Sequence, residues 1–340
     1  MIERDNQITT NQGTLQDNKL DLALRPHQLD EYIGQTDVKM NLEISLKAAK
    51  KRQEPLEHLL FYGPPGLGKT TLANIVASEM GVSIKTTSGP AIEKQGDLAS
   101  ILTNLKENDV LFIDEIHRLK TQIEEILYSA MEDYALDIII GKGPAARSMR
   151  LDLPRFTLIG ATTKIGSLSA PLRDRFGHIH KLDFYSDLEI RKILERNARL
   201  LGMAIDEESL SKIAASSRRT PRIANRLLKR IRDFATVDNQ TEIKLDFTEA
   251  CLKTMGVDHL GLDKTDRQIL VTIIEKFQGG PVGVNAIAAA TAEETETIED
   301  LYEPYLLQIG FLDRTRQGRV VTESAYLHLE MNYKQRVVSG

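Results

Sequence analysis

The sequence predicts an α/β fold in which a parallel sheet is covered by helices, followed by a helical domain and a C-terminal winged-helix domain. Residues 25–183 alternate short apolar, strand-like runs with helical runs, which is typical of a parallel sheet with helical crossovers. Residues 184–256 show only helical periodicity. Residues 262–335 read as helices followed by one hairpin, within a winged-helix domain that we place at 257–340. Residues 1–24 are polar throughout, and we expect a disordered tail there.

The composition limits the class of protein. The chain has 340 residues, enough for two or three domains. It has one cysteine, Cys251, which favours a reducing compartment and a small buried side chain. It lacks an apolar run of about 18 residues and an apolar secretory segment near its start, so we expect a cytoplasmic protein. The net charge is 44 − 49 = −5, so nucleic acid binding would need a local concentration of basic residues.

The first chemical motif lies in residues 58–81, HLLFYGPPGLGKTTLANIVASEMG. A strand-like run precedes GPPGLGKT and a helical run follows it, which is the context that the G-x-x-x-x-G-K-[ST] motif requires. Three glycines let backbone N–H groups close around phosphate oxygens: Gly63, Gly66 and Gly68. Lys69 would reach the β- and γ-phosphates, and the Thr70 hydroxyl would ligate Mg²⁺. A glycine turn that precedes a helix by chance is the alternative.

Residues 110–117, VLFIDEIH, supply acidic groups for such a site. They form an apolar strand that ends in two carboxylates, and carboxylates are costly there unless they face a metal or a polar site. Asp114 would hold Mg²⁺, directly or through water, and Glu115 would polarise the attacking water as general base. A strand followed by a solvated helix cap is the alternative. We expect His117 to be structural.

A third strand, FTLIGATT at residues 156–163, ends in two threonines. Ligands of parallel sheets lie outside the carboxyl ends of the strands, so a hydroxyl here could fix the γ-phosphate or the water. We favour Thr163 over Thr162 for this role. Helix capping by a threonine is the alternative.

Two arginines in the stretch APLRDRFG at residues 170–177 have one acidic neighbour. Asp174 can neutralise only one of Arg173 and Arg175. On these residues alone, a surface ion pair with Asp174 or a nearby glutamate is the preferred interpretation, and such a pair contributes under about 1 kcal/mol.

Taken together, GPPGLGKTT, DEIH, GATT, LRDRFG and TPR resemble an AAA+ ATPase and, more narrowly, the RuvB family of bacterial Holliday-junction branch-migration motors. The similarity runs from about Leu24 to the C-terminus. It implies a P-loop AAA+ core at residues 25–183, a helical lid at 184–256, and a homohexameric ring that moves duplex DNA together with RuvA and RuvC.

The resemblance also implies site residues. Arg175 would be an arginine finger that enters the neighbouring subunit's active site, with Arg173 as a possible second, and Arg222 would be the second sensor. Catalysis would involve Lys69, Asp114, Glu115, Thr163 and Arg175. The ATP-binding set would be Leu24, Arg25, Gly66, Leu67, Gly68, Lys69, Thr70, Thr71, Glu132, Asp133, Tyr134, Arg175, Tyr185 and Arg222.

Basic residues gather in SRRTPRIANRLLKRIR at residues 217–232. Pro221 suits the first turn of a helix, and Thr220 suits its cap. Apart from Arg222, these basic residues are open to a simpler interpretation as a solvated face.

The C-terminal region predicts a DNA contact on the wing of the winged helix. The third helical segment carries six acidic residues that phosphate would repel: Glu293, Glu294, Glu296, Glu299, Asp300 and Glu303. Pro304 would bend or shorten this segment. The hairpin FLDRTRQGRVVT carries Arg314, Arg316 and Arg319, which fits phosphate contact without base readout. An ordinary solvated hairpin is the alternative.

A second hairpin is predicted at residues 135–154, ALDIIIGKGPAARSMRLDLP, where apolar residues alternate on both strands. Such a hairpin either packs on the core or exposes a docking edge, and the resemblance implies that it engages RuvA.

The sequence argues against two other classes of function. The first is a protein-unfolding or clamp-loader-like ATPase, because an unfoldase would carry an aromatic pore loop and a clamp loader would lack the basic wing. A nucleotide-gated DNA scaffold would need neither Glu115 nor Arg175.

Overall fold

The computed structural model describes residues 23–140 and 147–333 of the chain. The chain divides into two compact units. The sheet unit comprises Leu22–Gly63 and Leu67–Phe184, and the helical unit contains Pro64–Gly66 and Tyr185–Gly340. Among the described residues, none of the helices combines the length and apolar character that a membrane crossing needs.

The sheet unit is built on a five-stranded sheet in which every neighbouring pair of strands is parallel. The spatial order of the strands is β2-β3-β6-β1-β7. Their bounds are β1 (Leu59–Tyr62), β2 (Ile84–Ser88), β3 (Val110–Asp114), β6 (Thr157–Thr162) and β7 (His178–Lys181). The three central strands β3, β6 and β1 are almost wholly buried, which explains why they read as continuous apolar runs in the sequence.

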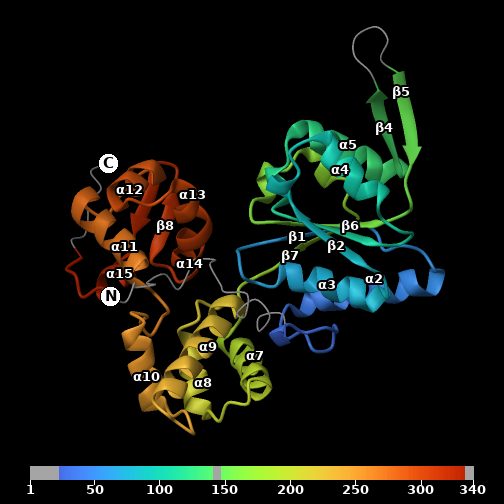
Figure 1. The fold of residues 1–340 in the computed structure, drawn as a ribbon. Helices are drawn as coiled ribbons and strands as arrows, with labels where there is room; N and C mark the ends of the chain where they lie inside the picture. Colours follow the sequence, from blue (N-terminus) through green and yellow to red (C-terminus); the bar gives the residue numbers. More distant parts are fainter. Residues whose placement is uncertain (1–22, 141–146, 334–340) are drawn as a thin grey trace. The chain divides into compact units, whose positions relative to one another are not determined.

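Helices cover both faces of this sheet (Figure 1). Helices α2 (Thr36–Arg52) and α3 (Lys69–Met80) lie on one face, and α4 (Gln95–Thr103) and α5 (Thr121–Asp133) lie on the other. The second face holds the main apolar cluster, in which Leu60, Leu111 and Leu158 of the sheet pack with Leu98 and Leu127 of the helices. The short helix α6 (Ala170–Arg173) contributes Leu172 to the same cluster.

The apolar hairpin is present as β4 (Ala135–Ile140) and β5 (Arg147–Asp152), paired antiparallel with Leu136 opposite Leu151. It extends away from the sheet (Figure 1). Leu136 and Leu153 at its base are buried in the core cluster, whereas Met149 is 43% exposed. Both alternatives therefore hold in part, because the base packs on the core and the strand beyond it exposes an apolar side chain. The predicted turn, KGP, lies outside the described residues.

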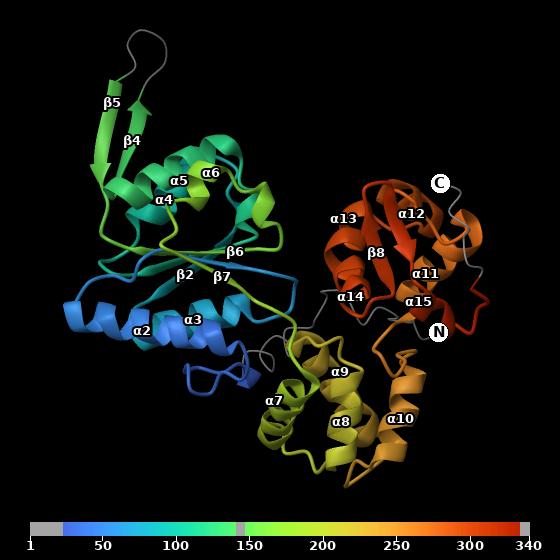
Figure 2. The same ribbon diagram turned by 180° about the vertical axis from the view of Figure 1, so that it is seen from behind.

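The helical unit begins with four helices (Figure 2): α7 (Asp187–Leu200), α8 (Glu207–Ala215), α9 (Pro221–Val237) and α10 (Leu245–Thr254). Ser186 and Glu189 form a capping box that starts α7. Pro221 is the first residue of α9, as its fixed φ favours. Thr220 is the N-cap residue, but its hydroxyl donates to the Ser217 carbonyl oxygen rather than capping the helix.

The remainder of the unit is a winged helix. Its elements are α11 (Lys264–Phe277), α12 (Val284–Thr291), α13 (Thr295–Thr297), α14 (Glu303–Gln308), β8 (Leu312–Thr315), β9 (Gly318–Val321) and α15 (Glu323–His328). The acidic helical segment is interrupted by a π-helical turn at Ile298–Tyr302, directly before the α14 turn that holds Pro304. Strand β9 pairs with β8 on one side and bridges to Val282 on the other, so β9 is the inner strand of the wing.

Candidate nucleotide site and wing

The loop between β1 and α3 has the backbone that a phosphate cradle needs. Gly63, Gly66 and Gly68 have φ values of +142°, +84° and +101°, a region that favours glycine. A Cβ at Gly63 would lie 2.4 Å from the Leu182 carbonyl oxygen, and one at Gly68 would lie 2.6 Å from the Tyr32 hydroxyl. Any other residue at Gly63 or Gly68 would therefore be strained in its backbone and would clash with its neighbours.

The start of α3 places the two side chains that the motif assigns to phosphate and metal. Lys69 is the first residue of the helix and is 7% exposed, and its ammonium group donates to the Gly63 carbonyl oxygen at 2.8 Å. Thr70 and Thr71 follow in the first turn and are half-buried. The Tyr32 hydroxyl donates to the Leu67 carbonyl oxygen at 3.2 Å, a support for the loop that the sequence did not reveal.

The two carboxylates lie at the same edge of the sheet. The carboxyl ends of β3, β6 and β1 are adjacent, because β6 pairs with β3 on one side and with β1 on the other. Asp114 ends β3, and Glu115 follows it with a positive φ of 48°. Asp114, Glu115, the two threonines that end β6 and the phosphate loop after β1 therefore share one edge, where ligands of parallel sheets bind.

The two threonines at the end of β6 differ in their partners. Thr162 is fully buried, and its hydroxyl oxygen accepts the Lys164 N–H at 2.9 Å and lies 3.0 Å from His117 Nδ1. The Thr163 hydroxyl is buried and has no hydrogen-bond partner among the described residues. Because this hydroxyl lies at the carboxyl end of β6, where ligands of parallel sheets bind, it is available to a ligand, and the geometry favours Thr163 over Thr162.

His117 has a closer relation to the site than the sequence suggested. Its Nδ1 lies 3.2 Å from Glu115 Oε2 as well as 3.0 Å from the Thr162 hydroxyl. The His117 ring therefore lies between the Glu115 carboxylate and the end of β6. The sequence offered only the position of His117 two residues after Glu115 as a sign of this contact.

Arg175 lies at the opposite edge of the sheet. Its guanidinium is paired with Glu132 Oε2 at 2.6 Å, and both side chains are exposed. Next to Glu132, the Met131 carbonyl oxygen lies 3.2 Å from Nε2 of His58, the residue before β1, and Tyr134 packs edge-on against Phe156, just before β6. The amino ends of the strands therefore meet here. The surface ion pair that the residues alone favoured is present in the single chain, with Glu132 as partner.

The start of α9 contacts Gly66, which belongs to the same unit. The Arg222 backbone N–H donates to the Gly66 carbonyl oxygen at 3.4 Å. A Cβ at Gly66 would lie 3.1 Å from the Arg222 Cβ, a contact tighter than most, and the φ of +84° also favours glycine here. The Arg222 side chain is exposed. Tyr185, which is 3% exposed, donates its backbone N–H to the Arg219 carbonyl oxygen.

The other predicted nucleotide contacts are more varied. Leu24 is 3% exposed, Arg25 is half-buried, and Asp133 pairs with Arg150 at 3.1 Å.

Among residues 23–140 and 147–333, no group of three or more histidine, cysteine, aspartate and glutamate side chains could hold a metal ion. A Mg²⁺ ion bound with nucleotide would not need one, because it takes few protein ligands and keeps its waters and phosphates.

The wing corrects one predicted DNA contact. Arg314 is 64% exposed at its side chain, and Arg316 is exposed in the turn. Arg319 is only 7% exposed, and its guanidinium binds Glu303 at 2.8 Å and Glu299 at 3.0 Å. The prediction that Arg319 contacts phosphate is therefore wrong, because Arg319 lies on the inner strand β9 and its guanidinium is buried against two carboxylates.

The basic segment at residues 217–232 is also more buried than a solvated face. Arg218 is 4% exposed and Lys229 is 8% exposed, whereas Arg230 is exposed. The simpler interpretation is therefore wrong for Arg218 and Lys229.

Models of three protein domains match the chain in succession. Residues 24–182 match the P-loop domain of the Holliday junction DNA helicase RuvB, residues 185–258 match the RuvB AAA lid domain, and residues 259–330 match the RuvB C-terminal winged helix domain. Together these matches account for nearly all of the described residues.

Individual relatives agree with these models. The chain is 58% identical over 334 residues to the Holliday junction branch migration complex subunit RuvB of Dehalococcoides mccartyi, covering 98% of this chain and 96% of that protein. The solved RuvB Holliday junction branch migration motor of Thermotoga maritima is 51% identical with a TM-score of 0.85, covering 92% of this chain and 100% of that one. A mutant of the same motor matches with 52% identity and a TM-score of 0.86, covering 92% of this chain and 99% of that one.

Proposed function

The chain belongs to the RuvB family, and we propose that it is an ATP-driven motor that moves the branch point of Holliday junctions along duplex DNA. The family match leaves no support for the clamp-loader-like, peptide-remodelling or scaffold alternatives. The observation that supports the motor most directly is the position of Arg175 at the sheet edge opposite the phosphate loop.

Hydrolysis is assigned to the edge that holds the phosphate loop. The loop amides and Lys69 bind the phosphates, and Glu115, held by His117, orients the attacking water as general base. The orphan hydroxyl of Thr163 fixes the γ-phosphate or that water. The donor set fits Mg²⁺, since Thr70 and Asp114 offer a hydroxyl and a carboxylate at one edge, and the ion when bound would neutralise charge on the phosphates.

A second copy of the chain completes this site. Strand β6 has six residues, which corresponds to about 20 Å between the two edges of the sheet. Arg175 and Glu132 thus lie too far from their own phosphate loop for an arginine side chain to bridge. We propose a hexameric ring in which Arg175 acts on the neighbour's γ-phosphate, as arginine fingers supplied by another chain do. Glu132, Asp133 and Tyr134 would border the neighbour's nucleotide from the same edge, and Leu24, Arg25, Tyr185 and Arg222 would bind it in their own chain.

DNA contact is assigned to the wing, and the revised footprint is Arg314 and Arg316. Both are exposed arginines on a hairpin, which suits contact with phosphates of any sequence. We further propose that RuvA docks on the β4–β5 hairpin, where Met149 is exposed beyond the buried base. RuvC would act on the same junction, in the cytoplasm.

Mixing two inactive variants tests the shared site. Lys69→Ala lacks the phosphate-binding amine, and Arg175→Ala lacks the finger, so we expect each alone to lose at least about 1000-fold in ATPase rate. Mixed rings contain some interfaces that pair an intact loop with an intact finger, and ATPase and junction migration should partly return. The matched control mixes Arg175→Ala with the Lys69→Ala/Arg175→Ala double variant, which supplies no intact finger. Recovery in the control, or none in the test mixture, would contradict a site shared between subunits.

A further inference from the structure

Arg218 occupies an unusual turn directly before α9, the helix that holds Arg222 in its first turn. Arg218 and Arg219 both have a φ of +54°. Two successive non-glycine residues in the left-handed region are disfavoured, so surrounding contacts must fix them.

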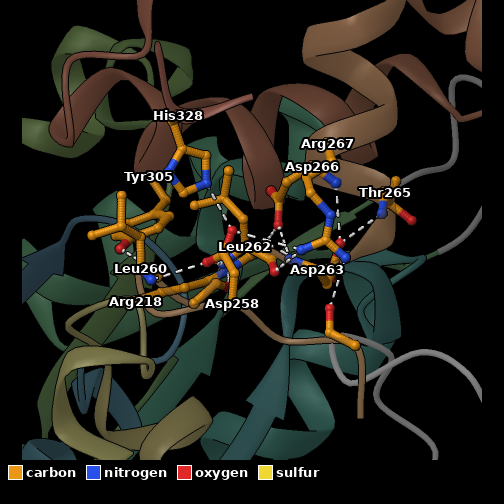
Figure 3. Close-up of polar contacts among 12 residues, drawn as sticks. Arg218, Asp258, Leu260, Leu262, Asp263, Thr265, Asp266, Arg267, Tyr305 and His328 are labelled. Atoms are coloured by element: carbon orange, nitrogen blue, oxygen red, sulfur yellow. Dashed lines mark hydrogen bonds and ion pairs between the residues drawn. The ribbon is translucent and has the colours of Figure 1, made fainter. Parts of the chain in front are cut away.

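Those contacts lie in the winged helix (Figure 3). The Arg218 guanidinium is ion-paired with Asp266, which is fully buried, and Asp263 lies 3.7 Å away. Its Nε donates to the Gly261 carbonyl oxygen at 3.0 Å. The guanidinium also lies over two aromatic rings, with 5.7 Å to the Tyr302 centroid and 5.6 Å to the Tyr305 centroid. One arginine from the lid is thus enclosed by acidic and aromatic groups of the winged helix.

The chain between the lid and the winged helix is fixed on both sides of this arginine. Asp258 lies 2.8 Å from His328 Nε2 and 3.6 Å from Arg267. Arg267 donates to the carbonyl oxygens of Gly256 and Leu262, and Tyr305 donates to that of Leu260. Gly261 lies so close to Ser216 of the lid that a Cβ on Gly261 would be 2.6 Å from the Ser216 carbonyl oxygen. These contacts restrain residues 256–262, which connect the lid to the winged helix.

The other end of the same turn contacts Tyr185 and Gly66. The Arg219 carbonyl oxygen accepts the Tyr185 N–H at 3.1 Å, and the Arg222 N–H donates to the Gly66 carbonyl oxygen. Residues 218 and 222 are four apart; the Arg218 side chain contacts the winged helix, and the Arg222 backbone contacts Gly66. Arg218 therefore joins the turn that contacts Gly66 to the winged helix, beside the contacts of Asp258, Gly261 and Arg267.

We propose that Arg218 is a positioning residue that couples ATP turnover to movement of the DNA-binding winged helix, by locking the turn that holds Arg222 onto Asp266, Tyr302 and Tyr305. The proposal rests on the proposed motor function. Arginine is suited to this position because its planar fork can stack between rings while it pairs with a carboxylate, and lysine cannot do both.

The test separates coupling from folding. Arg218→Met combined with Asp266→Leu removes both charges of the buried pair and keeps apolar volume, while Asp263 keeps the hydrogen bonds that it accepts at the start of α11. Arg218→Lys is the second variant, and Arg219→Met is the matched control, since Arg219 lies in the same turn with a side chain 43% exposed. The measurements are melting temperature, ATP and duplex affinity, ATPase with and without duplex DNA, and base pairs migrated per ATP with RuvA present.

We expect the Arg218 variants to bind ATP and duplex as the wild type does and to keep basal ATPase. Stimulation of ATPase by DNA should be lost, and base pairs migrated per ATP should fall at least about tenfold, as for loss of an ordinary coupling energy. Arg219→Met should behave as the wild type. If either folded Arg218 variant keeps DNA stimulation and migration per ATP, or loses all activities in proportion to its melting temperature, the coupling role is wrong. A wild-type protein that fails to migrate junctions would instead contradict the proposed function.

Discussion

Replacing Arg319 by alanine should destabilise the winged helix rather than weaken a phosphate contact. The guanidinium makes hydrogen bonds to both Glu303 carboxylate oxygens, at 2.8–3.2 Å, and one to Glu299 at 3.0 Å. Glu303 is 3% exposed. Removal of Arg319 leaves that carboxylate buried without its partner, and breaking a buried pair in this way costs about 3–5 kcal/mol.

Arg314 provides the matched comparison, because it lies directly opposite Arg319 in the hairpin. Its guanidinium is 3.9 Å from Glu303 and its side chain is 64% exposed, so its loss should cost under about 1 kcal/mol of stability. Arg314→Ala should instead weaken DNA binding evenly across sequences and lower the salt slope by about one unit.

Calorimetry and fluorescence anisotropy distinguish the two outcomes. For a domain of this size, a loss of 3 kcal/mol lowers the melting temperature by more than about 10 °C, and we expect this for the winged-helix transition in Arg319→Ala. Anisotropy of a labelled duplex across a salt series gives the slope for each variant. An Arg319→Ala protein that melts as the wild type does and has a salt slope lower by one unit would refute the buried-pair reasoning.

Two further predictions concern the sheet unit. Thr163→Val should lower the ATPase rate about 100-fold, as removal of one transition-state donor does, whereas Thr162→Val should mainly lower the melting temperature. His180 is 8% exposed and burial lowers its pKa from 6.5 to about 4. Between pH 6.5 and pH 4, His180 is therefore protonated in the unfolded chain but neutral in the folded chain. The free energy of unfolding should fall by up to about 1.4 kcal/mol for each pH unit as the pH is lowered from 6.5 towards 4. Urea midpoints of wild type and His180→Asn across this range check it.

The local motifs could be predicted because their chemistry lies within one short stretch. The glycines of the phosphate loop have positive φ, and the acids after β3 and the threonines after β6 meet at one sheet edge, as parallel strands require. The contact of His117 with Glu115 could not be predicted, since it depends on the turn at Glu115.

The wing shows why charge counts do not give the DNA footprint. The sequence places six acids on one segment and three arginines on the hairpin, and treating these two groups separately predicted three phosphate contacts. In the structure Arg319 lies on the inner strand, between β8 and Val282, where Glu303 and Glu299 meet it. Arg314 is on the edge strand and stays exposed. Strand order, which the sequence does not specify, decides which arginine faces solvent.

The ion pairs of Arg175 and Arg218 differ in burial, and this difference suits them to different roles in the proposed motor. The Arg175–Glu132 pair is exposed on both sides, so it contributes under about 1 kcal/mol, and a neighbour's phosphate can displace Glu132 at little cost. The Arg218–Asp266 pair is almost fully buried, and separating its two charges while both stay buried would be costly. The proposed cycle needs one contact that exchanges partners with each ATP and one connection that stays intact. The exposed Arg175 pair fits the first, and the buried Arg218 pair fits the second.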